Sequence, residues 1–147
     1  MATVQSCIAQ KPHVLHCLGP QDSVQAALQL MSDHRVRSVM VIEQGALKGI
    51  VSERDCALKV LLPGLDAHST PLATVMTGDP VTVGLRDSLE HCMREMTTRS
   101  IRHLPVVEGG AVIGMISIGD IVKDIMRQQE QHIRYLETYI KGHSASY

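Results

Sequence analysis

Two short stretches of the chain place a serine and an aspartate three positions apart, directly after an apolar run. Ser52 and Asp55 lie in GIVSERD, and Ser117 and Asp120 lie in GMISIGD. This spacing is typical of a capping box, in which both side chains satisfy N–H groups at the start of a helix. A carboxylate beside the free N–H groups of a helix N-terminus can also hold a polar or anionic ligand. Helix capping and ligand binding are therefore both open interpretations.

The sequence around these motifs repeats at a distance of 65 positions. Sliding the chain over itself by that distance aligns the two halves without a gap, which indicates an internal duplication. Identical residues at this offset include the pairs Gly19/Gly84, Asp22/Asp87, Ser23/Ser88, Met31/Met96, Arg37/Arg102, Val41/Val106, Gly45/Gly110 and Gly49/Gly114. A chain of 147 residues suits two half-domains that share a core.

Each repeat has the residue pattern of a β-α-β-β-α unit. The second repeat predicts a strand over 80–83, a helix over 86–100 capped by Asp87 or Ser88, strands over 103–108 and 111–117 joined across Gly109-Gly110, and a helix that Asp120 opens. The first repeat predicts the same elements over 15–18, 22–34, 38–43, 46–52 and 53–62.

The strands are nearly all apolar, so both faces of each small sheet need cover. Packing the two halves together about a pseudo-twofold axis supplies that cover. We therefore expect a mixed α/β (α+β) fold of two tandem units followed by a long C-terminal helix. The expected division is 1–62 for the first repeat with the N-terminal segment, 63–71 for a linker, 72–127 for the second repeat, and 128–147 for the helix extension and tail.

Composition and charge exclude two classes of partner. The net charge is −1, acidic and basic residues are mixed along the chain, and Phe and Trp are absent. Nucleic acid is therefore not an expected partner, because neither a basic patch nor stacking aromatics are present. The start of the chain lacks a basic and apolar leader, and no apolar run approaches the roughly 18 residues of a membrane span. We expect a cytoplasmic protein without a membrane partner.

The cysteines do not follow metal-site or disulfide spacing. Cys7, Cys17, Cys56 and Cys92 are scattered, so free and mostly buried thiols are expected. His13, His16 and Cys17 lie close together in HVLHC and suggest a metal or redox site as one alternative. In an extended segment, however, the two histidines point to opposite faces, and the chain has no second ligand pair with zinc spacing. We expect no metal.

These features together resemble a tandem pair of cystathionine β-synthase (CBS) domains, the Bateman module. The resemblance rests on the two glycine-to-aspartate endings quoted above and on RHLPVVE (102–108), VMTGDPVTV (75–83) and SERD (52–55). It covers about residues 2–127, and the remaining tail is similar to the long final helix of small stand-alone bacterial members. Two motifs in register, with all flanking elements repeated, make the resemblance specific.

The resemblance implies two nucleotide sites. In the family the aspartate binds ribose hydroxyls, the serine binds ribose or phosphate, and basic residues at the first strand of the hairpin that precedes them bind phosphate. One site is then assigned Asp120, Ser117, Arg102 and His103, with Gly119 leaving the helix start open and Pro105 bending the strand. The other site is assigned Asp55, Ser52 and Arg37, with Arg54 as a lesser candidate. Adenine is expected near Thr82 and Val83 and near Cys17 and Leu18.

Each assignment has a structural alternative. Arg37 and Arg102 would otherwise be solvated surface cations, His103 a hydrogen-bonded strand histidine, and Arg54 half of a surface ion pair. The first repeat also has Ser38 where the second has His103. The site of Asp120 is therefore expected to bind phosphate more strongly.

No catalytic constellation occurs in the sequence, since the two aspartates repeat as equivalents where catalysis requires an unlike acid and base. We expect a sensing module, not an enzyme, that binds AMP first, ADP or ATP next, and acts on an unknown effector protein. NAD(H) or S-adenosylmethionine is an alternative ligand. A structural dimerisation module with capped helices and a redox or metal sensor are the alternatives from other classes.

The C-terminal region carries an apolar stripe. It comprises Val122, Met126, Gln129, Ile133, Leu136 and Ile140, at alternating spacings of four and three. Such spacing is typical of a coiled-coil seam. The stripe either folds back over its own sheet or packs against a second subunit, and the family resemblance favours a homodimer.

Overall fold

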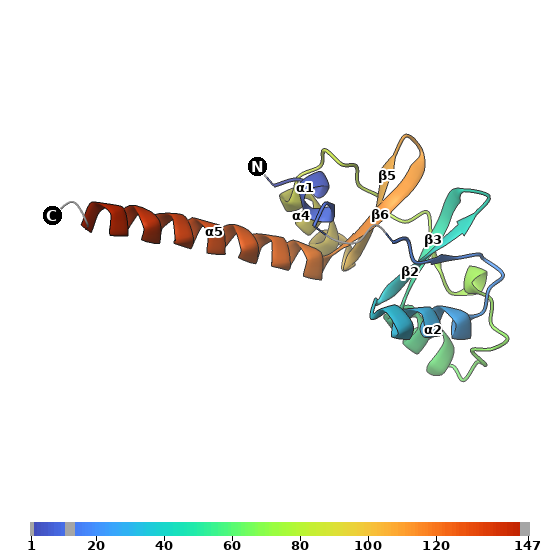
Figure 1. Cartoon of the computed structure of the whole chain (residues 1–147). Helices are drawn as coiled ribbons and strands as arrows, with labels where there is room; N and C mark the ends of the chain where they lie inside the picture. The colour runs from blue at the N-terminus through green and yellow to red at the C-terminus, as the bar shows by residue number, and fades with distance from the viewer. Residues whose placement is uncertain (1, 11–13, 145–147) are drawn as a thin grey trace.

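The computed structural model describes residues 2–10 and 14–144, and Figure 1 shows their arrangement. The mixed α/β character and the long C-terminal helix are confirmed. The elements are α1 (Val4–Ile8), β1 (Cys17–Leu18), α2 (Val24–His34), β2 (Ser38–Glu43), β3 (Ala46–Ser52), α3 (Glu53–Cys56), η1 (Ala57–Leu61), η2 (Leu72–Thr74), β4 (Thr77–Gly78), α4 (Leu89–Arg99), β5 (His103–Glu108), β6 (Ala111–Ser117) and α5 (Ile118–Ser144).

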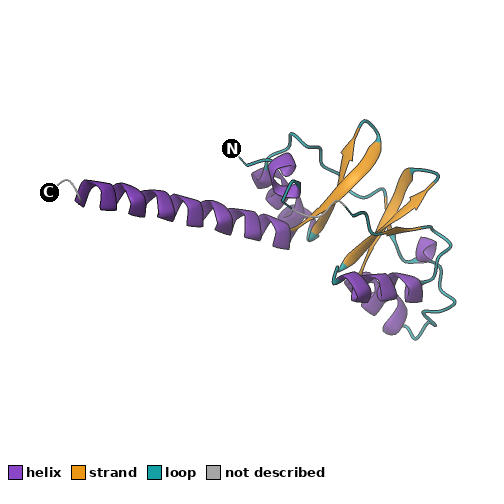
Figure 2. Cartoon of the chain, in the orientation of Figure 1, coloured by secondary structure: helices purple, strands orange, loops and turns teal. Residues whose placement is uncertain are grey.

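Both hairpins have the expected bounds, and Figure 2 shows them as two pairs of strands with helices beside each. Gln44 and Gly45 have φ of +50° and +78°, and Gly109 and Gly110 have φ of +58° and +82°. Two successive residues with positive φ make the two-residue turn that matches the twist of a hairpin. The matching strands β3 and β6 contact each other, as packing about a pseudo-twofold axis requires.

The expected strand over 80–83 does not form, and Val83 makes a single parallel bridge to β5. In the first repeat, the Met40 N–H donates to the His16 carbonyl at 3.0 Å and so extends the pairing of β1 with β2. The position matched to Met40 is Pro105, which has no N–H to donate. The missing hydrogen bond explains why residues 80–83 do not form the counterpart of β1; the other additional strand of the first sheet, β4 (Thr77–Gly78), pairs with β3.

The two longer helices begin and end in the same way in both repeats. Ser23 and Ser88 are the N-caps, so Ser88, and not Asp87, starts α4. Arg35 and Ser100 are the C-caps, and both have φ of +54°. Matched caps place the segments that follow, and therefore the starts of β2 and β5, at equivalent positions.

The helix expected over 53–62 changes type after one turn. It is an α-helix over Glu53–Cys56 and a π-helix over Ala57–Leu61, where the Leu62 N–H donates to the Ala57 carbonyl at 2.9 Å. This helix ends within the first unit. Its counterpart in the second repeat, α5, continues for 27 residues.

The buried side chains form two clusters, and each cluster includes a segment from the other part of the sequence. The Val4 N–H of α1 donates to the Asp87 carbonyl at 2.9 Å, so α1 packs on the second unit. The Leu72 N–H donates to the Asp22 carbonyl at 2.9 Å, so η2 and then β4 pack on the first unit. The two units defined by their packing therefore differ from the expected division of the sequence, in which the N-terminal segment belongs with the first repeat in residues 1–62.

The helix α5 leaves the body of the protein after its first turns (Figure 1). Ile121 is fully buried in the second core, but Val122, Met126, Ile133, Leu136 and Ile140 are between 43% and 61% exposed. The C-terminal stripe therefore does not fold back over its own sheet.

Candidate functional site

Both serine–aspartate pairs form the hydrogen bonds of a capping box. The Ser117 N–H donates to Asp120 Oδ2 at 2.9 Å, and the Asp120 N–H donates to Ser117 Oγ at 3.1 Å. The Ser52 N–H donates to Asp55 Oδ2 at 2.9 Å, and the Asp55 N–H donates to Ser52 Oγ at 3.1 Å. Helix capping is thus confirmed in both repeats, and it occupies one oxygen of each carboxylate.

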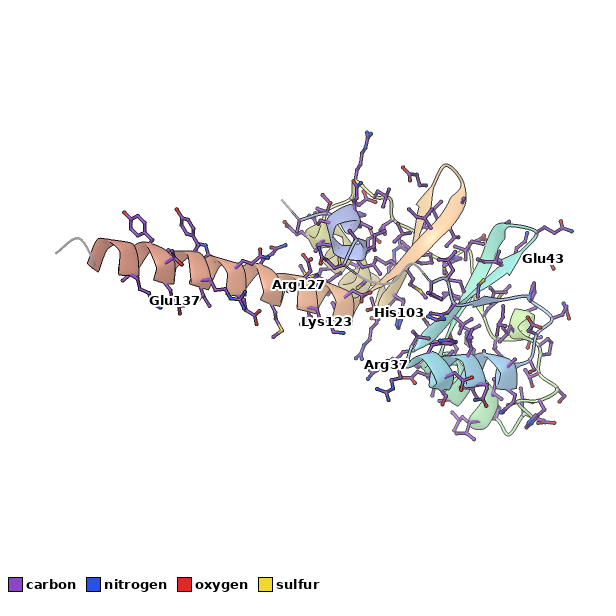
Figure 3. The ribbon with its side chains drawn as sticks, viewed as in Figure 1. Arg37, Glu43, His103, Lys123, Arg127 and Glu137 are labelled. Atoms are coloured by element: carbon purple, nitrogen blue, oxygen red, sulfur yellow. The ribbon has the colours of Figure 1, made fainter. Side chains whose placement is uncertain are left out.

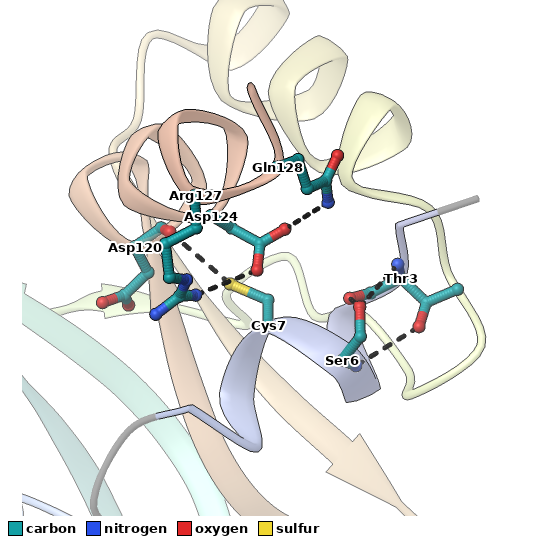
Figure 4. Close-up of polar contacts among 7 residues, drawn as sticks. All are labelled: Thr3, Ser6, Cys7, Asp120, Asp124, Arg127 and Gln128. Carbon is teal, nitrogen blue, oxygen red and sulfur yellow. Dashed lines mark hydrogen bonds and ion pairs between the residues drawn. The ribbon is translucent and has the colours of Figure 1, made fainter. Parts of the chain in front are cut away.

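The residue one helical turn later differs between the repeats. Lys59 Nζ lies 3.2 Å from Asp55 Oδ1 and also donates to the Val75 carbonyl at 2.9 Å. The position matched to Lys59 is Asp124, which is 6% exposed and accepts hydrogen bonds from Arg127 at 3.0 Å and Gln128 at 2.7 Å (Figure 4). A lysine therefore holds the second oxygen of Asp55, and no such lysine follows Asp120 at that spacing.

A cavity of about 870 Å³, here called the Asp120 cavity, lies between the repeats. From the second repeat it is lined by Arg102, His103, Ser117, Gly119, Asp120 and Lys123. From the first repeat it is lined by His16, His34, Arg35, Arg37, Ser38 and Met40. Figure 3 shows Arg37, His103 and Lys123 where the start of α5 meets the two hairpins. The motif of one repeat thus faces the first strands of the other.

A second cavity of about 740 Å³, here called the Asp55 cavity, has the reciprocal composition. The first repeat contributes Arg37, Ile50, Ser52, Glu53, Arg54 and Asp55. The second repeat contributes Asp79, Pro80, Val81, Arg99, Arg102 and His103. Packing about the pseudo-twofold axis therefore crosses the two halves, so neither cavity is built from a single repeat.

The structure brings most of the expected site residues together. Arg37, Arg102 and His103 line both cavities, whereas the sequence assigned each to one. Five of the expected residues line neither cavity. Four of them are the expected adenine contacts Cys17, Leu18, Thr82 and Val83, and the fifth is Pro105, which was expected to bend the strand. The residues just before them, Val14 to His16 and Asp79 to Val81, line the cavities instead. The cause is sheet pairing, which buries Val83 and Pro105 and pairs Cys17 with β2.

Four polar residues of the Asp120 cavity were not among the residues assigned to a site from the sequence: His16, His34, Arg35 and Lys123. Lys123 had a local signal, because residues three apart on a helix share a face and Lys123 follows Asp120 by three. The other three belong to the first repeat and lie far from Asp120 in the sequence. Only the crossed packing brings them to its cavity.

The two cavities differ in charge balance. Arg35, Arg37, Arg102 and Lys123 line the Asp120 cavity, where Asp120 is the acidic residue among the described lining residues. In the Asp55 cavity, Glu53 lies 3.8 Å from Arg37, and two more acids are present. Arg99 also pairs with Glu95 at 2.7 Å, which lowers the pKa of the Glu95 carboxyl. The Asp120 cavity is therefore the more electropositive of the two.

Three of the four thiols, Cys7, Cys56 and Cys92, are buried, and Cys17 is exposed. Burial raises the pKa of the Cys92 thiol to about 11 and also raises the pKa of Cys56. High-pKa thiols react poorly, because the thiolate is the reactive form. Across residues 2–10 and 14–144 there is no group of three His, Cys, Asp or Glu side chains that could hold a metal; His13 lies outside the described residues. Among the described helices, α5 included, none has the length and apolar character that a membrane span requires.

Comparison with known proteins matches residues 10–61 and 72–127 to the CBS domain family model. The mitochondrial CBS domain-containing protein CBSX3 of Arabidopsis thaliana is 35% identical over 126 residues, 82% of this chain and 61% of that protein. The CBS domain-containing protein YhcV of Bacillus subtilis is 34% identical over 112 residues, 76% of this chain and 79% of that protein. The chain thus spans less than two thirds of the Arabidopsis relative.

Solved structures share the fold. A Burkholderia ambifaria protein with CBS domains, named for a suspected role in signal transduction, has a TM-score of 0.84 and 35% identity, covering 87% of this chain and 96% of that one. A CBS domain pair solved in complex with 5′-methylthioadenosine and S-adenosyl-L-methionine has a TM-score of 0.76 and 21% identity, covering 87% of this chain and 98% of that one. At that lower identity the second likeness concerns the fold alone.

Proposed function

The chain belongs to the CBS domain family, and from this premise we propose that it is a regulatory module that binds adenosine derivatives between its repeats and signals to a protein partner. The observation that supports this most strongly is the Asp120 cavity. It combines a carboxylate and a helix N-terminus from one repeat with arginines from both repeats. Capping the helix requires only Ser117 and Asp120, so capping alone leaves the arginines unexplained.

The proposed roles follow from the chemistry of each group. The Asp120 carboxylate accepts hydrogen bonds from the two ribose hydroxyls, and Ser117 binds ribose or phosphate. The N-terminus of α5, with Arg37 and Arg102, binds phosphate oxygens. AMP is the first choice, with ADP and ATP next and NAD(H) or S-adenosylmethionine as alternatives. The neighbour solved with two adenosine-containing compounds supports the adenosine group.

Isothermal titration calorimetry with AMP and 2′,3′-dideoxy-AMP tests the role of ribose. We expect AMP to bind with measurable heat and the dideoxy compound to lose about 1–3 kcal/mol, because the carboxylate loses its hydroxyl partners. Equal affinities would contradict the proposal and favour the structural alternative, in which the serine–aspartate pairs only cap helices.

A thermal-shift panel separates the ligand classes. Adenine nucleotides, NAD(H), S-adenosylmethionine and zinc are each added to the full chain. A ligand at a hundredfold its Kd stabilises the folded state by roughly 2.7 kcal/mol. A shift with zinc alone would favour the metal-sensor alternative.

We also propose that α5 forms a homodimer through its exposed stripe. The stripe has coiled-coil spacing, and a parallel pairing places His132 opposite Glu137 of the second copy, where an imidazole N–H can donate to the carboxylate. Truncation after Met126 removes most of the stripe and is expected to weaken dimerisation, as measured by light scattering at micromolar concentration. A monomeric full chain would contradict this proposal.

Several expectations stay predictions. These are the absence of independent catalysis, the cytoplasmic location, the lack of a nucleic-acid partner, and the division of the chain at the linker 63–71. The partner that receives the signal is proposed to contact α5 or the assembly it forms, because α5 begins at the Asp120 cavity and ends outside the body. A ligand bound at the first turn of α5 would thereby influence the exposed stripe farther along the same helix.

A further inference from the structure

The Asp120 cavity carries more positive charge than a monophosphate requires. Arg35, Arg37, Arg102 and Lys123 are opposed by Asp120 among the described lining residues, and Glu53, which lies outside this lining, offsets part of the charge of Arg37 from 3.8 Å. The Asp55 cavity also has four cations, but these are opposed by Glu53, Asp55 and Asp79. A cavity with one sign of charge focuses its field and attracts a ligand of opposite charge. The two cavities therefore select ligands of different charge.

Three basic residues of the first repeat, here called the His16 cluster, add to this charge. His16 and His34 have ring centroids 4.6 Å apart, and Arg35 follows His34 directly. All three line the Asp120 cavity. The two rings are tilted by 37°. Two adjacent imidazoles beside an arginine repel one another when they carry charge, and a bound polyanion relieves that repulsion.

The end of a helix does not by itself explain the His16 cluster. Basic residues stabilise a helix C-terminus through its dipole, and His34 ends α2 while Arg35 caps it. The second repeat provides a control for the cap residue, since Ser100 caps α4 with the same φ of +54° and without charge, although Arg99 keeps a basic residue at the position matched to His34. The position matched to His16 is Val81, which is apolar. The left-handed cap usually takes Gly or Asn, so backbone geometry does not call for an arginine either.

We propose that the Asp120 cavity takes a nucleoside polyphosphate, with the phosphates beyond the first held by Arg35, the His16–His34 pair and Lys123. The Asp55 cavity takes a less charged nucleoside or nucleoside monophosphate. This inference rests on the proposed binding of adenosine derivatives and changes the order of preference for one cavity: ATP replaces AMP as the first choice for the Asp120 cavity, and AMP stays the first choice for the Asp55 cavity. A polyphosphate carries enough negative charge to offset the surplus cations, whereas AMP leaves part of that surplus unpaired.

Isothermal titration calorimetry on the full chain with adenosine, AMP, ATP and inorganic tripolyphosphate, in EDTA, tests the inference. We expect ATP to bind the Asp120 cavity at least about tenfold more tightly than AMP, through additional charge-assisted hydrogen bonds. Arg35→Ser installs the residue that caps α4 and should reduce this preference to about threefold or less. Lys48→Ser removes the same charge from an exposed site on β3 outside both cavities and should leave the preference unchanged.

The outcomes separate the two proposals. Equal affinity for AMP and ATP, or an unchanged preference in Arg35→Ser, overturns the polyphosphate inference while leaving adenosine binding intact. Tripolyphosphate that binds and depends on Arg35, with no added affinity from the adenosine group, supports the anion site and overturns the proposed function. Circular dichroism checks that Arg35→Ser folds; if it does not, Lys123→Gln decides by the same ratio of affinities.

Discussion

The aspartates of the two repeats occupy the same capping geometry but open helices of different reach. Asp55 opens an α-helix of four residues and a π-helix of five, which end inside the first unit. Asp120 opens α5, which runs for 27 residues and leaves the body. One turn later, Lys59 binds the first aspartate, whereas Asp124 binds Arg127 instead. The duplicated motif thus fixes the start of a helix, and the residues after it decide what the carboxylate and the helix can do.

The largest expected effect comes from a change in a segment of one repeat that packs in the core of the other, as η2 does in the first core and α1 in the second. Leu72 is fully buried in the first core, so Leu72→Ala should cost about 2–5 kcal/mol of unfolding free energy. Hydrogen exchange should show β2 and β3 losing more protection than β5 and β6. Val4→Ala is the matched control, because Val4 is buried in the second core and should reverse this order. Equal loss in both hairpins would show that the two cores unfold as one.

The next effect tests which aspartate binds ligand more strongly. Asp120→Ala should weaken AMP binding at the Asp120 cavity by about 1–3 kcal/mol, since a partly buried hydrogen-bond acceptor is lost. Asp55→Ala should have a smaller effect, because Lys59 already occupies one oxygen of Asp55. Calorimetric titration of both variants measures the difference. Loss of the tighter site in Asp55→Ala would reverse the ranking.

A third prediction uses His103, whose matched position in the first repeat is the buried Ser38. A histidine gains positive charge as the pH falls through about 6.5, and a phosphate stabilises that charged form. AMP affinity should therefore rise by about 1 kcal/mol between pH 8 and pH 6, until the phosphate itself takes up a proton. Titrations of the wild type and His103→Ala at both pH values provide the measurement. An unchanged pH dependence in the variant would assign the effect to another group.

The smallest expected effect on ligand affinity concerns Lys59. Lys59→Met keeps a long side chain but removes the ion pair with Asp55, an i,i+4 pair that is 46% exposed at the lysine. Losing the hydrogen bond to the Val75 carbonyl should lower stability by about 0.5–1.5 kcal/mol, whereas the ion pair itself contributes only about 0.3–0.5 kcal/mol. The freed carboxylate oxygen should raise the affinity of the Asp55 cavity for AMP by a similar amount, measured by calorimetry. A fall in affinity would instead show that Lys59 contacts the phosphate.

Local patterns predicted the parts of the fold that local chemistry decides. The hairpins could be predicted to the residue because β-branched runs flank Gln44-Gly45 and Gly109-Gly110, and these dipeptides adopt the backbone that a tight turn needs. The capping serines could be predicted for the same reason. The strand over 80–83 could not, because the residue that prevents its pairing is Pro105 on the opposite strand.

Long-range packing decided the rest. The sequence gives no indication that α1 joins the second core, since either core can bury Val4 and Ile8. Each cavity is lined by both repeats for a similar reason, because only the pseudo-twofold packing brings His16 and Arg35 to the cavity of Asp120. The aspartates and serines of the site, with Arg37 and Arg102, were therefore predictable from the repeat. Arg35 and the partition of the residues between the cavities were not.

Because α1 packs in the second core and η2 in the first, the two cores are completed at different times during synthesis. The first unit has all its elements once residue 78 has left the ribosome, because β4 is its last strand. The helix α1 emerges far earlier, yet its core is complete only after Ile121. At translation rates of about 5–20 residues per second, Val4, Cys7 and Ile8 wait roughly 5–20 s for their partners. During that interval Val4, Cys7 and Ile8 stay exposed beside a finished unit, because a segment of five residues is too short to hold a helix without its packing partners. Exposed apolar side chains of this kind make a nascent chain prone to aggregation until the second core forms.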